Sequence, residues 1–159
     1  MKQLILFLFL TLNLNAQEKV SLAVYIDPTL MIKGDTHNNP AGTLNLILQL
    51  KMQGNEQSIG YMVIFPEFEY ADLSKSYIRY SANIGYNFYT PIKHLEALLS
   101  GGWGILSREG TTWHSGSLEG VISLKINKFK INLMGQLVDR KDIKEIRFSG
   151  FVGIELYLN

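Results

Sequence analysis

Apolar and polar residues alternate with a period of two along most of the chain after Val20. In the clearest stretch, one set takes every second position (Ile78, Tyr80, Ala82, Ile84, Tyr86, Phe88), and a polar set lies between its members (Arg79, Ser81, Asn83, Asn87). A β-strand points successive side chains to opposite faces, so this pattern predicts strands with one apolar and one polar face. No sustained 3.6-residue stripe follows the first 16 residues, and the pattern predicts an all-β fold.

Turn-forming residues divide the alternating region into eight segments, which are predicted to be strands. Their approximate bounds are 20–32, 42–52, 59–71, 75–89, 95–106, 112–126, 129–138 and 144–158. The connections between them are short, so neighbouring segments can pair as antiparallel hairpins. The fold class we expect is an eight-stranded antiparallel up-and-down barrel.

Strand register can be predicted from the requirement that paired residues share a face. A two-residue turn at Asn127-Lys128 would place Leu124 opposite Ile131 and Leu118 opposite Leu137, matching apolar with apolar. On the polar face, we expect Glu67 opposite Arg79. In the last hairpin, Lys128 is expected near Glu155 and Gln136 near Arg147.

Strand length and aromatic residues favour a barrel that crosses a membrane. Most segments exceed ten residues, whereas soluble strands average about 5–6 and a tilted membrane-spanning strand needs about 9–11. Aromatic residues gather near the segment ends, as in the interfacial girdles of membrane barrels. The predicted girdle consists of Tyr70, Tyr80, Tyr86, Phe88, Trp103, Phe129 and Phe148.

The polar face would then line the interior. The predicted internal ion-paired network consists of Glu67, Arg79, Glu96, Glu119, Lys125, Lys130, Arg147 and Glu155, and Lys51 and Glu69 share the same face. An eight-stranded barrel is just wide enough for side chains to fill it. We therefore expect no open pore. The same residues on a protein in water would form a solvated outer face.

The N-terminus has the order of a secretory signal peptide. Lys2 precedes an apolar run from Leu4 to Leu12, and Ala16 is a small residue at the expected cleavage site. The run is about half the roughly 20 residues that a membrane-spanning helix needs. We expect a signal peptide at 1–16 and a barrel domain at 17–159.

Composition narrows the class further. The 159 residues fit one domain, and 15 basic against 14 acidic residues give no signature of nucleic-acid binding. The chain has no cysteine, which excludes disulfides, thiolate metal sites and a lipid-modified N-terminal cysteine.

By architecture, the chain resembles the small eight-stranded outer-membrane barrels of the OmpX and OmpA-transmembrane-domain kind, over Val20 to Asn159. The resemblance implies a monomer in the outer membrane of a Gram-negative bacterium, with membrane lipids and the barrel-assembly machinery as partners. It also implies a non-enzymatic role, structural or carried by exterior loops. Those loops would be short: 33–41, about 72–74, 107–111 and 139–143.

Two other classes of function remain as alternatives. Gly101-Gly102-Trp103 matches the Gly-x-Trp signature of lipocalins, which would make this a secreted or periplasmic barrel that binds a small apolar ligand. The stretch 113–119 contains serine, histidine and acidic residues like those that lipid A hydrolases use in catalysis. Alternation, however, places His114 on the face opposite Ser115, Ser117 and Glu119, so the histidine could not act on either serine. We therefore expect no catalytic residues.

No metal or cofactor site is expected either. The three histidines, His37, His94 and His114, lie in separate segments without metal-ligand spacing.

Overall fold

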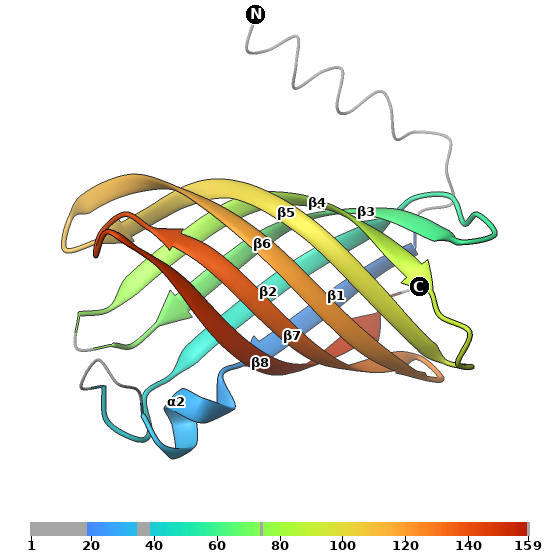
Figure 1. The fold of residues 1–159 in the computed structure, drawn as a ribbon, viewed down its shortest axis with the longest axis horizontal. Coiled ribbons are helices and arrows are strands. Elements are labelled where there is room, and N and C mark those ends of the chain that lie inside the picture. The colour runs from blue at the N-terminus through green and yellow to red at the C-terminus, as the bar shows by residue number, and fades with distance from the viewer. Residues whose placement is uncertain (1–18, 35–38, 74, 159) are drawn as a thin grey trace, which may run out of the picture.

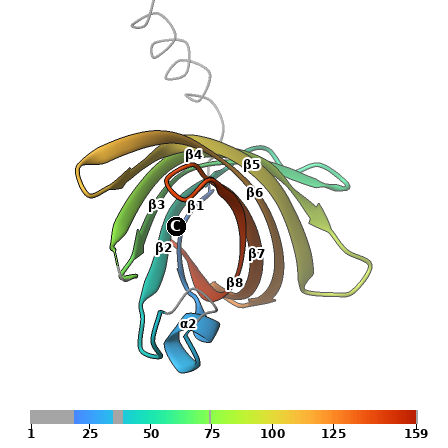
Figure 2. The same cartoon turned by 60° about the vertical axis from the view of Figure 1, so that its left-hand side comes forward.

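The computed structural model describes residues 19–34, 39–73 and 75–158 and forms one closed antiparallel barrel. Each strand pairs with the next along the chain, and the last pairs with the first (Figures 1 and 2). The strands are β1 (Lys19–Ile26), β2 (Asn45–Gln53), β3 (Gly60–Ala71), β4 (Tyr77–Tyr89), β5 (Leu95–Arg108), β6 (Thr111–Ile126), β7 (Phe129–Arg140) and β8 (Glu145–Tyr157). The predicted fold class is confirmed. The predicted signal peptide at 1–16 lies outside the described residues.

The barrel has two distinct ends. At one, which we call the terminal end, β1 begins and β8 finishes, and the connections after β2, β4 and β6 are found there. At the other lie the connections after β1, β3, β5 and β7, together with the short helix α2 (Pro28–Ile32). We call this the helix end, and Figure 1 shows it on the left.

Helix α2 occupies a region that the sequence analysis assigned to the first strand, so that assignment was wrong beyond Ile26. Proline lacks an N–H and is suited to the first turn of a helix, where Pro28 lies. The Asp27 carboxylate caps this turn by accepting hydrogen bonds from the backbone N–H groups of Thr29 and Leu30, at 2.9 and 3.1 Å. These residues end β1 earlier than the apolar pattern implied.

The register of the β6–β7 hairpin is the predicted one, with Leu124 opposite Ile131 and Leu118 opposite Leu137. Two other registers differ from the prediction by two residues. Arg79 lies opposite Glu69 instead of Glu67, and Glu155 lies opposite Lys130. A shift of two residues leaves every side chain on its original face, so alternation cannot detect it.

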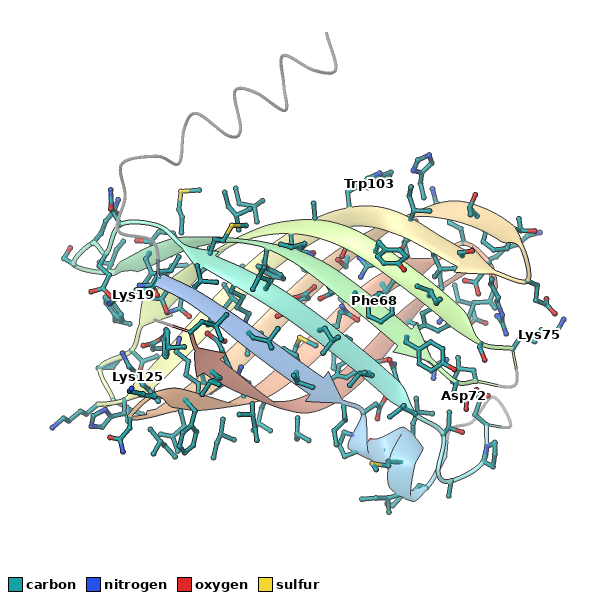
Figure 3. All side chains as sticks on the ribbon, turned by 180° about the vertical axis from the view of Figure 1, so that it is seen from behind. Lys19, Phe68, Asp72, Lys75, Trp103 and Lys125 are labelled. Atoms are coloured by element: carbon teal, nitrogen blue, oxygen red, sulfur yellow. The ribbon has the colours of Figure 1, made fainter. Side chains whose placement is uncertain are left out.

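The alternation separates two environments. Side chains of one set point into the barrel, and those of the other set cover its outer wall with apolar and aromatic groups. Charged groups such as Lys19 and Lys125 gather at the terminal end, and Asp72 and Lys75 lie at the helix end (Figure 3). The apolar wall lies between these two charged ends.

Candidate functional site

The interior of the barrel near the terminal end is held together by ion pairs around Glu155. Its carboxylate lies 2.8 Å from the Lys51 Nζ and accepts a hydrogen bond of 2.8 Å from Ser21. Lys51 also donates to the Tyr25 hydroxyl at 3.0 Å. Asn132 donates to the same hydroxyl. These groups come from β1, β2, β7 and β8, so the network joins the strands on both sides of the barrel's closure.

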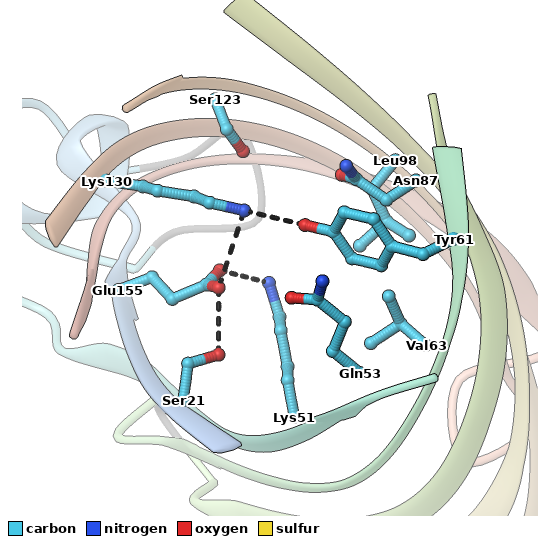
Figure 4. Close-up of a pocket in the computed structure, with 10 residues that line it drawn as sticks. All are labelled: Ser21, Lys51, Gln53, Tyr61, Val63, Asn87, Leu98, Ser123, Lys130 and Glu155. Carbon is cyan, nitrogen blue, oxygen red and sulfur yellow. Dashed lines mark hydrogen bonds and ion pairs between the residues drawn. The ribbon is translucent and has the colours of Figure 1, made fainter. Parts of the chain in front are cut away.

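A second pair lies beside the first. Lys130 Nζ is 2.7 Å from the Glu96 carboxylate and 3.0 Å from the Tyr61 hydroxyl, and it lies 3.8 Å from Glu155. Figure 4 shows Lys51, Lys130 and Tyr61 pointing toward one another around the small space they enclose. That space has a volume of only about 10 Å³, which is room for about one water molecule. The interior here is filled by side chains.

The middle layer contains two carboxylates bridged by two amides. Gln49 Nε2 donates to Glu67 at 2.6 Å and to Glu119 at 3.1 Å, and Gln136 Nε2 donates to the same two carboxylates at 3.2 and 3.3 Å. Arg79 Nη1 lies 2.7 Å from Glu67 and so compensates its charge. All five side chains are buried. The layer therefore links four strands, β2, β3, β6 and β7, to Arg79 on β4.

A third cluster closes the interior near the helix end. Tyr77 donates a hydrogen bond to Glu69, and the Arg140 guanidinium lies 3.8 Å from the centre of the Tyr77 ring. Asp142 in the β7–β8 turn lies 2.7 Å from Arg140 and 2.9 Å from Arg108. Burial alone would raise the pKa of Asp142, but hydrogen bonds and the charges of Arg140 and Arg108 hold it below its ordinary value.

An apolar cluster covers this layer. It is formed by Leu30, Ala71, Leu73, Tyr77 and Leu106, with Trp113 packed against it. Leu30 is the residue of α2 that points inward, and it is 2% exposed. The helix therefore contributes one side chain that closes the barrel at the helix end.

Six of the eight residues predicted for the internal network lie together in the interior: Glu67, Arg79, Glu96, Glu119, Lys130 and Glu155. The other two, Lys125 and Arg147, are half-buried near the two ends of the barrel. Lys125 lies 5.5 Å from the centre of the Tyr157 ring.

The sequence analysis did not assign a role to Gln49, Gln136 or Arg140, although each belongs to the interior network. Arg140 was placed in a loop. Arg140 follows Gln136 by four residues, so on a continuous strand both side chains point to the same face. Extending the predicted strand 129–138 by two residues would have identified Arg140 as an interior residue.

The outer wall is apolar on all sides. Among the predicted girdle residues, Tyr80, Phe88, Trp103, Phe129 and Phe148 are exposed on it, and Tyr70 and Tyr86 are half-buried. Trp103 stacks on His114 with ring centres 5.9 Å apart, and Phe68 packs against Tyr80 at 5.2 Å. In water, such a surface would be strongly unfavourable, because burying apolar area is worth roughly 25 cal/mol per Å².

The residues compared with hydrolases do not form a catalytic group. Ser115 donates its hydroxyl hydrogen bond to the backbone carbonyl of Asp139, and Ser117 lies against Arg79 at 2.6 Å. His114 is on the outer wall, stacked on Trp103. The histidine and the serines therefore lie on opposite sides of the barrel wall.

The residues that the structure describes contain no group of three or more His, Cys, Asp or Glu side chains that could hold a metal ion. None of their helices is long and apolar enough to cross a membrane.

The fold is similar to the solved structures of an outer-membrane protein and of a surface protein. One is Ail from Yersinia pestis in a phospholipid bilayer nanodisc, with a TM-score of 0.53 and 12% identity, covering 89% of this chain and 100% of Ail. The other is Neisserial surface protein A, with a TM-score of 0.54 and 8% identity, covering 87% of this chain and 94% of that protein. No family model and no curated protein sequence matches. The class that the structure defines is the small eight-stranded barrel found in outer-membrane proteins.

Proposed function

We propose that this protein is a non-enzymatic β-barrel of a Gram-negative outer membrane. The main observation behind the proposal is that polar and charged side chains lie inside the barrel and apolar side chains cover its outer wall. Ionisable side chains such as Glu67, Arg79 and Lys51 are buried inside the barrel, whereas the outer wall exposes leucine, isoleucine and aromatic side chains. This arrangement suits a hydrocarbon environment outside and a polar core inside.

The fold also satisfies the main constraint that lipid imposes on a backbone. Hydrocarbon offers no hydrogen-bonding partners, so a spanning sheet must close on itself. Here β1 pairs with β8, and the ladder is continuous around the barrel. Ail, one of the solved structures with a similar fold, is an outer-membrane protein, which supports the same location for this chain.

The filled interior argues against a diffusion channel. The ion pairs and bridging amides occupy the lumen, and the apolar cluster around Leu30 covers them at the helix end. The role that remains is a structural one, or an interaction made through the short connections at the helix end. The partners we propose are membrane lipids and, during insertion, the barrel-assembly machinery, with the barrel acting as a monomer.

The lipocalin-like alternative requires an apolar interior that can accept a ligand. Charged and amide side chains occupy that space, and the free volume among them near the terminal end is about 10 Å³. An apolar ligand of even modest size would have to displace buried ion pairs such as that between Lys51 and Glu155.

A reconstitution experiment tests the proposal. The purified chain is mixed with lipid vesicles, and its incorporation and the conductance of planar bilayers containing it are measured. We expect the protein to co-float with the vesicles and to give no steady conductance. A soluble protein that stays out of the vesicles would contradict the membrane assignment, and a steady ion current would contradict the filled interior.

A further inference from the structure

The seam between β1 and β8 is the shortest part of the barrel wall. β1 pairs with β8 only from Ser21 to Ile26, with Ile26 opposite Val152. β8 begins at Glu145, so its first seven residues extend past this ladder toward the helix end. Helix α2 lies against β8 in this region, beside the wall (Figure 2).

The side chains of α2 divide between two directions. Leu30 points into the apolar cluster that covers the interior. Met31 and Ile32 point away from it and are 50% and 72% exposed. On β8, the outward residues Ile146 and Phe148 are 76% and 68% exposed. This part of the rim therefore carries several of the most exposed large apolar side chains among the described residues.

These residues continue the apolar wall. Phe148 belongs to the predicted aromatic girdle, and its cross-strand neighbour Leu137 is an exposed residue of the wall on β7. Further along β8 toward the terminal end lies an apolar groove on the wall, formed by Val24, Ile26, Ile131, Val152, Gly153 and Ile154. The surface that would contact lipid thus reaches from this groove through Phe148 to Ile146 at the helix end.

Charged residues flank the apolar positions. Lys33 directly follows α2 and Lys144 directly precedes β8, and both are exposed. Glu145 partly offsets this charge. Basic residues beside an exposed apolar helix face are typical of segments that lie in the membrane interface, where phosphate groups meet the acyl chains.

We propose that α2 lies in the headgroup region of the leaflet at the helix end, with Met31 and Ile32 inserted among the acyl chains. The occupant of this apolar surface is therefore membrane lipid. Along the β1–β8 seam, the lipid would then extend further toward the helix end than elsewhere on the wall. Helix α2 would cover the part of β8 that extends past β1. This inference rests on the proposed membrane location.

The absence of cysteine allows a site-specific test. Single-cysteine variants Ile32→Cys, Leu133→Cys and Thr112→Cys are labelled with a nitroxide and reconstituted in vesicles of phosphatidylcholine and phosphatidylglycerol. Collision rates with oxygen, which concentrates in lipid, are compared with those of a water-soluble nickel chelate. Leu133 is an exposed residue of the apolar wall, and Thr112 is an exposed polar residue beside the β5–β6 turn at the helix end. Heat-dependent gel mobility verifies that each variant is folded.

We expect the label at position 32 to favour oxygen over nickel, as at position 133 and unlike position 112. A label at 32 that reacts with nickel like that at 112, while position 133 favours oxygen, would overturn this inference alone. A label at 32 that neither reagent reaches would also overturn it, because it would indicate contact with protein. Nickel access at position 133 would instead overturn the membrane location itself.

Discussion

Glu119 has the least compensated charge among the interior residues described above. It is 1% exposed, and its described hydrogen-bond donors are neutral groups, Gln49, Gln136 and Ser100. The carboxylate that shares both amides with it, Glu67, is already paired with Arg79. A buried carboxylate without a cation is costly, because water no longer solvates its charge.

Replacing this charge by a neutral amide of the same shape should stabilise the barrel. Glu119→Gln keeps one acceptor oxygen and adds an N–H group that can bond to Glu67. We expect the variant to unfold in urea with a free energy about 1–2 kcal/mol higher than that of the parent. The matched control is Glu155→Gln, which breaks the buried pair with Lys51 and should cost about 3–5 kcal/mol. A free energy of unfolding for Glu119→Gln below that of the parent would contradict this account of Glu119.

Asp142 links the β7–β8 turn to the barrel and should make stability depend on pH. Its pKa is held below the ordinary value of 3.8, so the folded state favours the ionised form. The stabilisation is therefore complete well above pH 3.8 and is lost as the pH falls through the lowered pKa. We expect Asp142→Asn to be less stable than the parent at neutral pH, and this difference to narrow in acid. Urea titrations over that range measure this difference, with Asp139→Asn as the control, because Asp139 is half-exposed and lies 3.8 Å from Lys141. A difference in free energy of unfolding between Asp142→Asn and the parent that stays constant with pH would contradict the stabilising role of the ionised Asp142.

For single residues, the alternation predicted which side chains face the interior. It did not predict which residues lie opposite each other on neighbouring strands. Glu67 meets Arg79 diagonally, although the residue opposite Arg79 is Glu69. The bridging roles of Gln49 and Gln136 could not be predicted, because they depend on four strands meeting across the lumen at one height. Sequence pattern carries parity along a strand, but no information on the stagger between strands.

Among the elements, α2 differs most from what the pattern predicted. Asp27-Pro28 is a start signal for a helix, but the sequence analysis continued the first strand through it to residue 32. The local capping bonds and the burial of Leu30 decide the conformation instead. The strands themselves were predictable, since long alternating segments have few other solutions that bury one face.

Leu30 should stabilise the helix end of the barrel. Truncation by Leu30→Ala removes a buried side chain from the cluster with Leu73, Tyr77 and Leu106. We expect a loss of about 2–4 kcal/mol in the free energy of unfolding. The neighbouring substitution Thr29→Ala removes an exposed side chain of the same helix that lies outside the cluster, and it should change this free energy by less than about 1 kcal/mol. Equal effects of the two substitutions would show that Leu30 does not close the barrel.

For the whole molecule, the decisive feature is that the polar and apolar faces are inverted relative to a protein in water. Strand lengths and aromatic positions predict this inversion from the sequence alone. They could not predict how completely the lumen is filled, because filling depends on side chains from all eight strands. In the structure, the lumen is filled by the ion pairs around Glu155 and by the carboxylates of Glu67 and Glu119 with their bridging amides.

Membrane fractionation, followed by gel electrophoresis with and without heating, tests the central claim most directly. A closed membrane barrel often keeps its structure in SDS until it is heated. We expect the protein in the outer-membrane fraction, released only by detergent, with a mobility that changes on boiling. Recovery in the soluble fraction without detergent would contradict the account, because the exposed leucine, isoleucine and aromatic side chains of the wall would then face water.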